Sequence, residues 1–202
     1  MKKLQEIELK ISDEHEDGVF AISLVDRPAI EEEFILLSKM DVQFKVIDKI
    51  KREVVGLALV PNKKIYRKFG EKEFNIFFSE NTIAKTQELY MRNCNNNNVT
   101  LEHETPTEGV TLVESWIVED TKQDKSNLYE LNAPKGSWVV KMKVYNDEVL
   151  KGIQEGTYNG FSIEGKFDGL NQLKASEQDN TKELIIDFLK SICCLLYTSP
   201  SP

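Results

Sequence analysis

The stretch TYNGFSIEGKF (157–167) places a serine between two glycines and could supply a catalytic nucleophile. A serine hydroxyl attacks a carbonyl carbon only when a base lies within hydrogen-bond reach. Gly-x-Ser is also common in turns, so a turn residue is the ordinary interpretation of Ser162 by itself. The nucleophile elbow of α/β-hydrolases is excluded, because it requires Gly-x-Ser-x-Gly and Gly165 comes one place too late. A catalytic role for Ser162 therefore depends on a base elsewhere in the chain.

Two histidines are the candidates for that base. His15 lies in the acidic stretch SDEHEDG, which is typical of a solvated turn. His103 lies between Glu102 and Glu104 in VTLEHE (99–104), which the alternation of residues predicts to be a strand. The two carboxylates would either neutralise a structural histidine or favour the imidazolium form of a general base. His103 is therefore the candidate base, and a structural histidine is the alternative.

No metal ion or cofactor is expected. A zinc site would need H-E-x-x-H or further ligands, and Cys94, Cys193 and Cys194 show no C-x-x-C spacing. The chain has no glycine-rich phosphate loop. Its 34 acidic residues offer carboxylate pairs everywhere, so such pairs do not indicate a glycosidase.

Charge and hydropathy exclude two kinds of partner. The net charge is −8 and no dense run of Lys and Arg is present, which argues against nucleic acid. No apolar run approaches the roughly 18 residues that cross a bilayer, and MKKLQEIELKI is not a signal peptide. We therefore expect a cytoplasmic protein without a membrane partner.

The elements that would position Ser162 and His103 are mainly short strands. Alternating or apolar runs predict strands over 4–11, 54–67 (two strands around a Pro-Asn turn), 73–79, 99–104, 109–120 and 136–145, and 157–167 is mainly extended. In VFAISLVDRPAI (19–30), Asp26-Arg27-Pro28 stops any regular element. Ser79 and Asn146 are predicted to cap two helices, and TKELIIDFLK (181–190) looks helical. EEEFILLSK (31–39) is either a short helix or an extended arm. Together these elements predict an α+β protein built around a mostly antiparallel sheet, which could close into a barrel.

The last residues differ in composition from the rest. SICCLLYTSPSP ends on a Ser-Pro repeat and resembles a translated sequencing adapter. We therefore expect one domain over residues 1–191 and a non-native tail over 192–202, with the natural C-terminus missing.

Seven segments follow one another in a distinctive order. They are VFAISLVDRPAI, VVGLALVPNKKIYR, FFSENTIAK…LYM, VTLEHE, GVTLVESWIVED, GSWVVKMKV and YNGFSIEGKF. The ordered set extends from about residue 7 to residue 168 and resembles the XkdF-type serine proteases of tailed phages and prophages, which mature the capsid.

The resemblance implies a herpesvirus assemblin-like fold, a mostly antiparallel closed β-barrel with peripheral helices. It also implies a serine endopeptidase in the host cytoplasm that works inside the assembling procapsid and cuts scaffold, the arms of the major capsid protein and itself. Ser162 would be the nucleophile and His103 the base, and backbone N–H groups near Gly160 or Gly165, or from another loop, would hold the oxyanion. Related proteases often carry an arginine shortly after the serine; here the place reads Glu164-Gly165-Lys166, so that role is unassigned.

The third member of a triad is open. Glu114 is favoured, because the alternation of its strand places it in an otherwise apolar row with Trp116, where a charge needs a partner. Glu119, Asp168 and Glu102 are alternatives, and so is a Ser–His dyad without a third member.

Two other functions fit the same sequence. One is a catalytically silent structural or scaffolding component of the procapsid with the same barrel, and the other is a host peptidase unrelated to phage. In an enzyme, Ser162 Oγ and His103 should lie within or near hydrogen-bond reach. Because the herpesvirus relatives form a dimer, a homo-oligomer is a further expectation from the resemblance.

Overall fold

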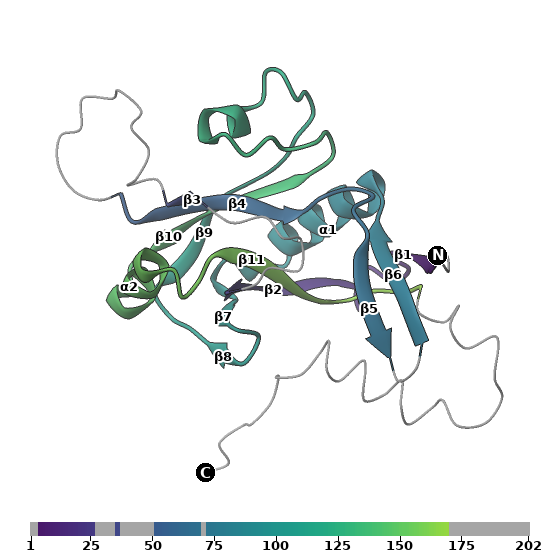
Figure 1. Ribbon diagram of the computed structural model, residues 1–202, viewed down its shortest axis with the longest axis horizontal. Helices are drawn as coiled ribbons and strands as arrows, with labels where there is room; N and C mark the ends of the chain where they lie inside the picture. Colours follow the sequence, from purple (N-terminus) through teal and green to yellow (C-terminus); the bar gives the residue numbers. More distant parts are fainter. Residues whose placement is uncertain (1–3, 27–34, 37–50, 70–71, 170–202) are drawn as a thin grey trace, which may run out of the picture.

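The computed structural model describes residues 4–26, 35–36, 51–69 and 72–169, and this part of the chain consists mainly of short strands with two α-helices (Figure 1). One sheet has the order β1-β6-β5, with β1 at Gln5–Leu9, β6 at Lys72–Phe78 and β5 at Ile65–Phe69. A second has the order β3-β4-β10-β9, with β3 at Ile35–Leu36, β4 at Glu53–Leu59, β10 at Trp138–Val144 and β9 at Val110–Ile117. The third has the order β11-β2-β7-β8, with β11 at Gly160–Lys166, β2 at Gly18–Val25, β7 at Val99–Leu101 and β8 at Thr105–Pro106.

Most of the ladders are antiparallel, as predicted. The parallel pairs are β1 with β6 and β2 with β7. The α+β prediction with a mostly antiparallel arrangement is therefore confirmed.

The predicted closed barrel is not found. A barrel requires every strand to pair on both sides, but in the described ranges each of the three sheets has a linear order with two ends. Strands β4 and β11 lie close together without forming a ladder in those ranges. The sheets are joined there by side-chain packing instead of a continuous ring of hydrogen bonds.

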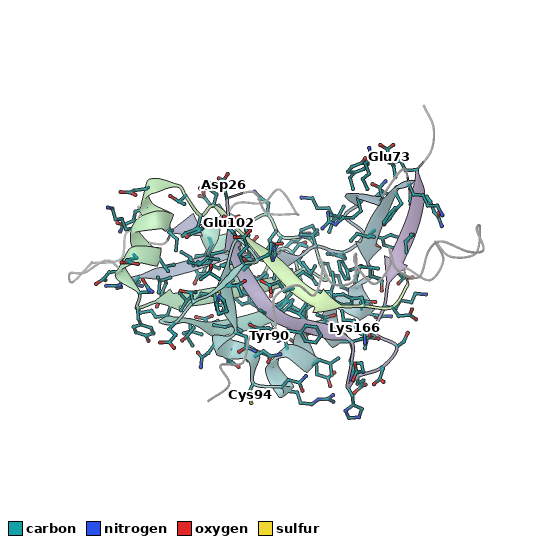
Figure 2. All side chains as sticks on the ribbon, turned by 90° about the horizontal axis from the view of Figure 1, so that it is seen from below. Asp26, Glu73, Tyr90, Cys94, Glu102 and Lys166 are labelled. Carbon is teal, nitrogen blue, oxygen red and sulfur yellow. The ribbon has the colours of Figure 1, made fainter. Side chains whose placement is uncertain are left out.

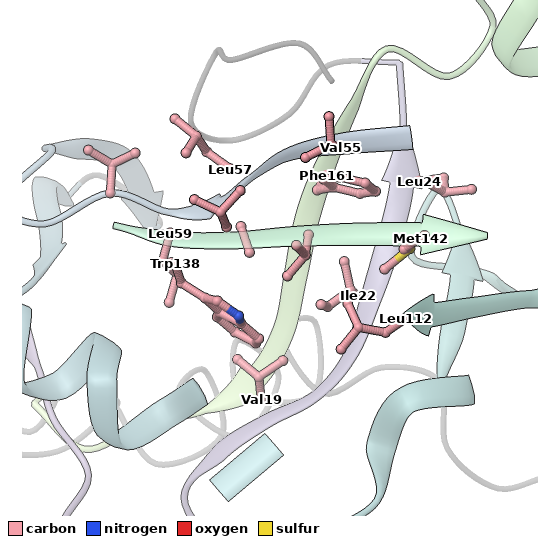
Figure 3. Close-up of a cluster of buried hydrophobic side chains, with 14 of the residues drawn as sticks. Val19, Ile22, Leu24, Val55, Leu57, Leu59, Leu112, Trp138, Met142 and Phe161 are labelled. Atoms are coloured by element: carbon pink, nitrogen blue, oxygen red, sulfur yellow. The ribbon is translucent and has the colours of Figure 1, made fainter. Parts of the chain in front are cut away.

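The hydrophobic core includes buried side chains from all three sheets, and Figure 3 shows a part to which the second and third sheets contribute. All seven residues from 54 to 60 are buried, which fits a strand covered on both faces. The buried side chains that meet there include Leu57, Leu59, Leu112, Trp138 and Met142 from the second sheet and Val19, Ile22, Leu24 and Phe161 from the third.

Two helices begin at the residues that the sequence predicts. Helix α1 (Glu80–Arg92) is capped by Ser79, whose hydroxyl accepts the N–H of Thr82. Helix α2 (Asp147–Glu155) is capped by Asn146. Helix α1 also adds to the core, because Tyr90 packs edge-on against Trp138 with ring centroids 5.4 Å apart.

Two short 3-10 helices lie in the connections. The asparagine-rich loop after α1 contains η2 (Asn95–Asn97), and the polar excursion between β9 and β10 contains η3 (Lys125–Tyr129). None of the helices in the described part is long and apolar enough to cross a membrane.

Three predictions fall largely or entirely on residues outside the described ranges. Within EEEFILLSK (31–39), the structure describes Ile35–Leu36, which are extended and pair with β4. The helix predicted over 181–190 and the non-native tail predicted over 192–202 lie outside the described residues.

Candidate active site

Ser162 lies in the middle of β11, as its extended surroundings predict. Strand β11 runs antiparallel to β2 and places Ser162 opposite Ser23. Strand β7 runs parallel to β2 on its other side and places Thr100 opposite Ser23. Three hydroxyl-bearing residues therefore form a row across three adjacent strands.

This row lies on the face of the sheet that points away from the main core. Phe161 is opposite Leu24, and both side chains belong to the core (Figure 3). Because successive side chains of a strand point to opposite faces, Ser162 and Ser23 point the other way. Ser162 is only 8% exposed and Ser23 is fully buried. The hydroxyl row is thus sheltered without being part of the apolar core.

His103 lies in a turn, not on a strand as predicted. Strand β7 ends at Leu101, and the next two residues, Glu102 and His103, have φ angles of 53° and 61°. This left-handed region is unfavourable for residues with a side chain, and such residues cluster at functional sites. The turn folds back over β2, because the His103 N–H donates to Ser23 Oγ at 3.0 Å.

Glu102, one of the alternatives for the third triad member, helps to hold this turn. Its backbone N–H donates to the Leu24 carbonyl, and its carboxylate accepts the N–H of Asp26 at 2.7 Å (Figure 2). The Asn159 side chain, just before β11, donates to the Asp26 carboxylate at 3.0 Å. The segments that carry Ser23, His103 and Ser162 are therefore tied together at one end of the sheet.

Glu164 is the carboxylate that contacts the His103 ring. Its Oε1 lies 3.2 Å from His103 Nδ1 and also accepts a hydrogen bond from the Thr100 hydroxyl. Burial raises the pKa of Glu164, but the hydrogen bonds from His103 and Thr100 outweigh this effect and hold the pKa below its ordinary value. Glu164 is therefore ionised at neutral pH.

The structure brings Ser162, His103 and Glu164 to one face of one sheet. Ser162 and Glu164 are two residues apart on β11, so their side chains point the same way. Within the part of the chain that the structure describes, Ser162 Oγ makes no hydrogen bond, including to His103. In unliganded enzymes, the bond between nucleophile and base is often long and tightens only with substrate.

Glu114 lies in the second sheet, and a β-bulge changes its predicted face. Leu112 pairs with Met142 and Glu114 pairs with the adjacent Lys141, which leaves Val113 without a partner on β10. One extra residue reverses the alternation of a strand. Glu114 therefore lies on the face opposite to Leu112, whereas the sequence predicted the same face.

The partners of Glu114 are lysines. Its Oε1 lies 2.5 Å from Lys141 Nζ, and its Oε2 accepts from Lys125, which also lies 4.1 Å from the centre of the Trp116 ring. Burial and the nearby charge of Lys141 lower the pKa of Lys125. Among the described residues no hydrogen bond or ion pair joins Glu114 to His103. The triad role of Glu114 stays a prediction, and these contacts supply no support for it.

Glu114→Gln is expected to lower the free energy of unfolding by about 1 kcal/mol and to leave proteolysis at the wild-type rate. The loss is small because Lys141 keeps a second carboxylate, Glu53, at 3.4 Å, and because Lys125 is half-exposed. Urea unfolding and a cleavage assay on the same preparation measure both effects. A large loss of cleavage without loss of stability would instead place Glu114 in the catalytic machinery.

The remaining predicted alternatives lie elsewhere. Glu119 is exposed two residues after β9. Asp168 accepts a hydrogen bond from the Ser12 hydroxyl at 2.7 Å and forms a backbone bridge with Lys10 beyond the far end of β11. Across the described ranges, no three His, Cys, Asp or Glu side chains are grouped so that they could hold a metal ion.

Sequence reasoning missed three residues of this site: Ser23, Thr100 and Glu164. The signal for Glu164 was present, because a residue two places after Ser162 on a strand must share its face. Ser23 and Thr100 could not be identified in the same way, since their positions depend on which strands pair.

The comparisons with known proteins identify the family of the chain. A family model described as "Putative phage serine protease XkdF" matches residues 39–170, which is more than half of the chain and includes His103, Ser162 and Glu164. No curated protein and no solved structure matches. The chain therefore belongs to the phage serine protease family XkdF.

Proposed function

We propose that the chain is a serine endopeptidase in which Ser162 is the nucleophile and His103 is the general base. The observation that carries the proposal is that the His103 ring, held by a carboxylate, lies on the sheet face to which Ser162 points. Membership of a phage serine protease family supports the same chemistry.

The reaction would proceed by acyl transfer. His103 accepts the Ser162 hydroxyl proton while Oγ forms a bond to the carbonyl carbon of the scissile peptide. Backbone N–H groups stabilise the oxyanion of the tetrahedral intermediate. The intermediate collapses as the imidazolium gives its proton to the leaving amine, and the C–N bond breaks. Water, deprotonated by the same imidazole, then attacks the acyl-enzyme and releases Ser162.

The biological role that fits this chemistry is capsid maturation. We propose that the enzyme cuts scaffold, the arms of the major capsid protein and itself inside the assembling procapsid, in the cytoplasm of the bacterial host. Family membership supports the phage context of this role. By analogy with the herpesvirus relatives, the working form would be a homo-oligomer.

A second candidate function is a catalytically silent structural or scaffolding component of the procapsid. The observation that favours it is that Ser162 Oγ forms no hydrogen bond with any described residue. An activated serine distinguishes the two candidates, because only a serine with a working base reacts rapidly with fluorophosphonates.

A fluorophosphonate probe is expected to label the wild-type chain at Ser162 and to leave Ser162→Ala unlabelled. Labelling is measured by peptide mapping in a mass spectrometer, with and without the major capsid protein of the same phage. Ser12→Ala is the matched control, because Ser12 bonds to Asp168 beyond the far end of β11. If the folded wild type stays unlabelled in both conditions, the structural function takes precedence.

A further inference from the structure

We propose that Glu164 is the positioning residue of this site: its carboxylate holds His103 in the tautomer with the proton on Nδ1, which leaves Nε2 free to act as the base. The catalytic consequence rests on the proposed function, whereas the tautomer itself does not.

The argument begins with the two groups that share Glu164 Oε1. The Thr100 hydroxyl donates to this oxygen, and His103 Nδ1 lies 3.2 Å from the same atom. An ionised carboxylate has no proton and can only accept hydrogen bonds. The neutral imidazole must therefore place its single proton on Nδ1, because in the other tautomer the Nδ1 lone pair would face the carboxylate oxygen with no proton between the two atoms.

The site fixes His103 at two points, on its backbone and on its ring. The backbone N–H is held by the buried Ser23 hydroxyl at 3.0 Å, and Ser23 is the direct cross-strand partner of Ser162. The ring is held by Glu164, which follows Ser162 on the same strand face. Both anchors are therefore tied to the nucleophile through β11 and β2, so the arrangement sets the base relative to Ser162.

The other carboxylates near His103 do not fill this role. Glu102 is directed at the N–H of Asp26. Glu104 is exposed, and its side chain makes no hydrogen bond to any residue in the described ranges. Glu164, with a side chain only 19% exposed, is the carboxylate in contact with the ring in this part of the chain.

Glu164→Gln tests the proposal because it keeps the shape of the side chain and changes its hydrogen-bonding character. An amide can donate to Nδ1 as well as accept from it, so it no longer requires the proton to be there. If the ring proton moves to Nε2, that nitrogen can no longer accept the proton of Ser162. Glu104→Gln makes the same chemical change next to His103 and serves as the matched control.

The deciding measurement is the ¹⁵N spectrum of the histidine rings in the 202-residue chain above neutral pH. The chain has two histidines, so His15→Gln assigns the signals. We expect the Nδ1–H form of His103 in the wild type and in Glu104→Gln, and a gain of the Nε2–H form in Glu164→Gln. A wild-type ring in the Nε2–H form, or the same tautomer in wild type and Glu164→Gln, would overturn the proposal. The measurement is repeated with Ser162→Ala, because the tautomer does not depend on activity.

An activity measurement then tests the catalytic consequence. Glu164→Gln should lower kcat by about 10²- to 10⁴-fold with little change in KM, since the residue acts through His103 and does not touch substrate. Glu164→Asp, which keeps the carboxylate, should recover part of the loss. If the fluorophosphonate probe never labels Ser162 but the His103 tautomer shifts in Glu164→Gln as expected, the proposed peptidase function is wrong. The proposed effect of Glu164 on the His103 ring is then still supported. If Ser162 is labelled and Glu164→Gln cleaves at the wild-type rate, the positioning role fails alone.

Discussion

Replacing either Ser162 or His103 with alanine is expected to lower kcat/KM for peptide cleavage by roughly 10⁴- to 10⁶-fold, and replacing both should lose no more than either alone. The effects are not additive because the two side chains act in one step. Without the base, the hydroxyl is a poor nucleophile, and without the hydroxyl, the base has no proton to accept. Cleavage of the capsid protein and of the chain itself, followed by gel and mass spectrometry, measures the loss.

The stability of the His103 variants separates a catalytic effect from misfolding. His103 has a φ of 61°, a conformation that costs about 1–2 kcal/mol for a residue with a side chain and little for glycine. His103→Gly should therefore unfold at a urea concentration no lower than His103→Ala, while both variants are inactive. A folded His103→Gly or His103→Ala that still cleaves at the wild-type rate would remove His103 from the mechanism.

The strands and helix caps could be predicted because their signals are local. Alternating or apolar runs predict strands over 4–11, 73–79 and 136–145, and each of these predictions matches a strand. Ser79 and Asn146 cap helices through bonds to residues two or three places away. Such contacts join residues that are close together in the sequence, so the sequence alone is enough to predict them.

The pairing of the strands could not be predicted in the same way. The Pro-Asn turn after β4 suggested two consecutive strands, and both are present, but β4 and β5 belong to different sheets. The first strand pairs in parallel with β6, about 65 residues later. The pairing of strands depends on how entire sheet and helix faces pack against one another. For this reason, the closed barrel expected from the family resemblance did not match the three open sheets of the described residues.

The candidate site shows the same division between local and distant signals. Ser162 could be placed on a strand from its neighbours. His103, one of the two histidines, lies near the same strand because its ring contacts Glu164. The sequence argument for Glu114 as the third carboxylate requires strict alternation along β9. The bulge after Leu112 ends that alternation, and it produces no clear signal in the sequence. The spacing of Glu164 from Ser162, by contrast, places the two side chains on one face of a strand without any knowledge of the pairing.

Gly165→Ala is expected to lower the free energy of unfolding by about 3 kcal/mol and to abolish cleavage. A Cβ at this position would lie 2.3 Å from the Gly18 carbonyl oxygen and 3.0 Å from Val19 Cα. Both atoms are backbone of β2, so no side chain can rotate to make room. Gly165 is thus required by the close approach of β2 and β11 at the irregularity in their register.

The activity should fall further than the stability alone explains, because the backbone that must shift also carries the site. Glu164 precedes Gly165 directly, so moving β11 away from β2 displaces the carboxylate from His103. Gly156→Ala is the control: its φ of 78° is unfavourable for alanine, but the nearest atom is 3.6 Å away, so about 1–2 kcal/mol and no loss of cleavage are expected. Urea unfolding and cleavage assays compare the two variants. If Gly165→Ala and Gly156→Ala lose the same stability, β2 can move away from β11 at little cost. The close approach of the two strands would then not preserve the geometry of Ser162, His103 and Glu164.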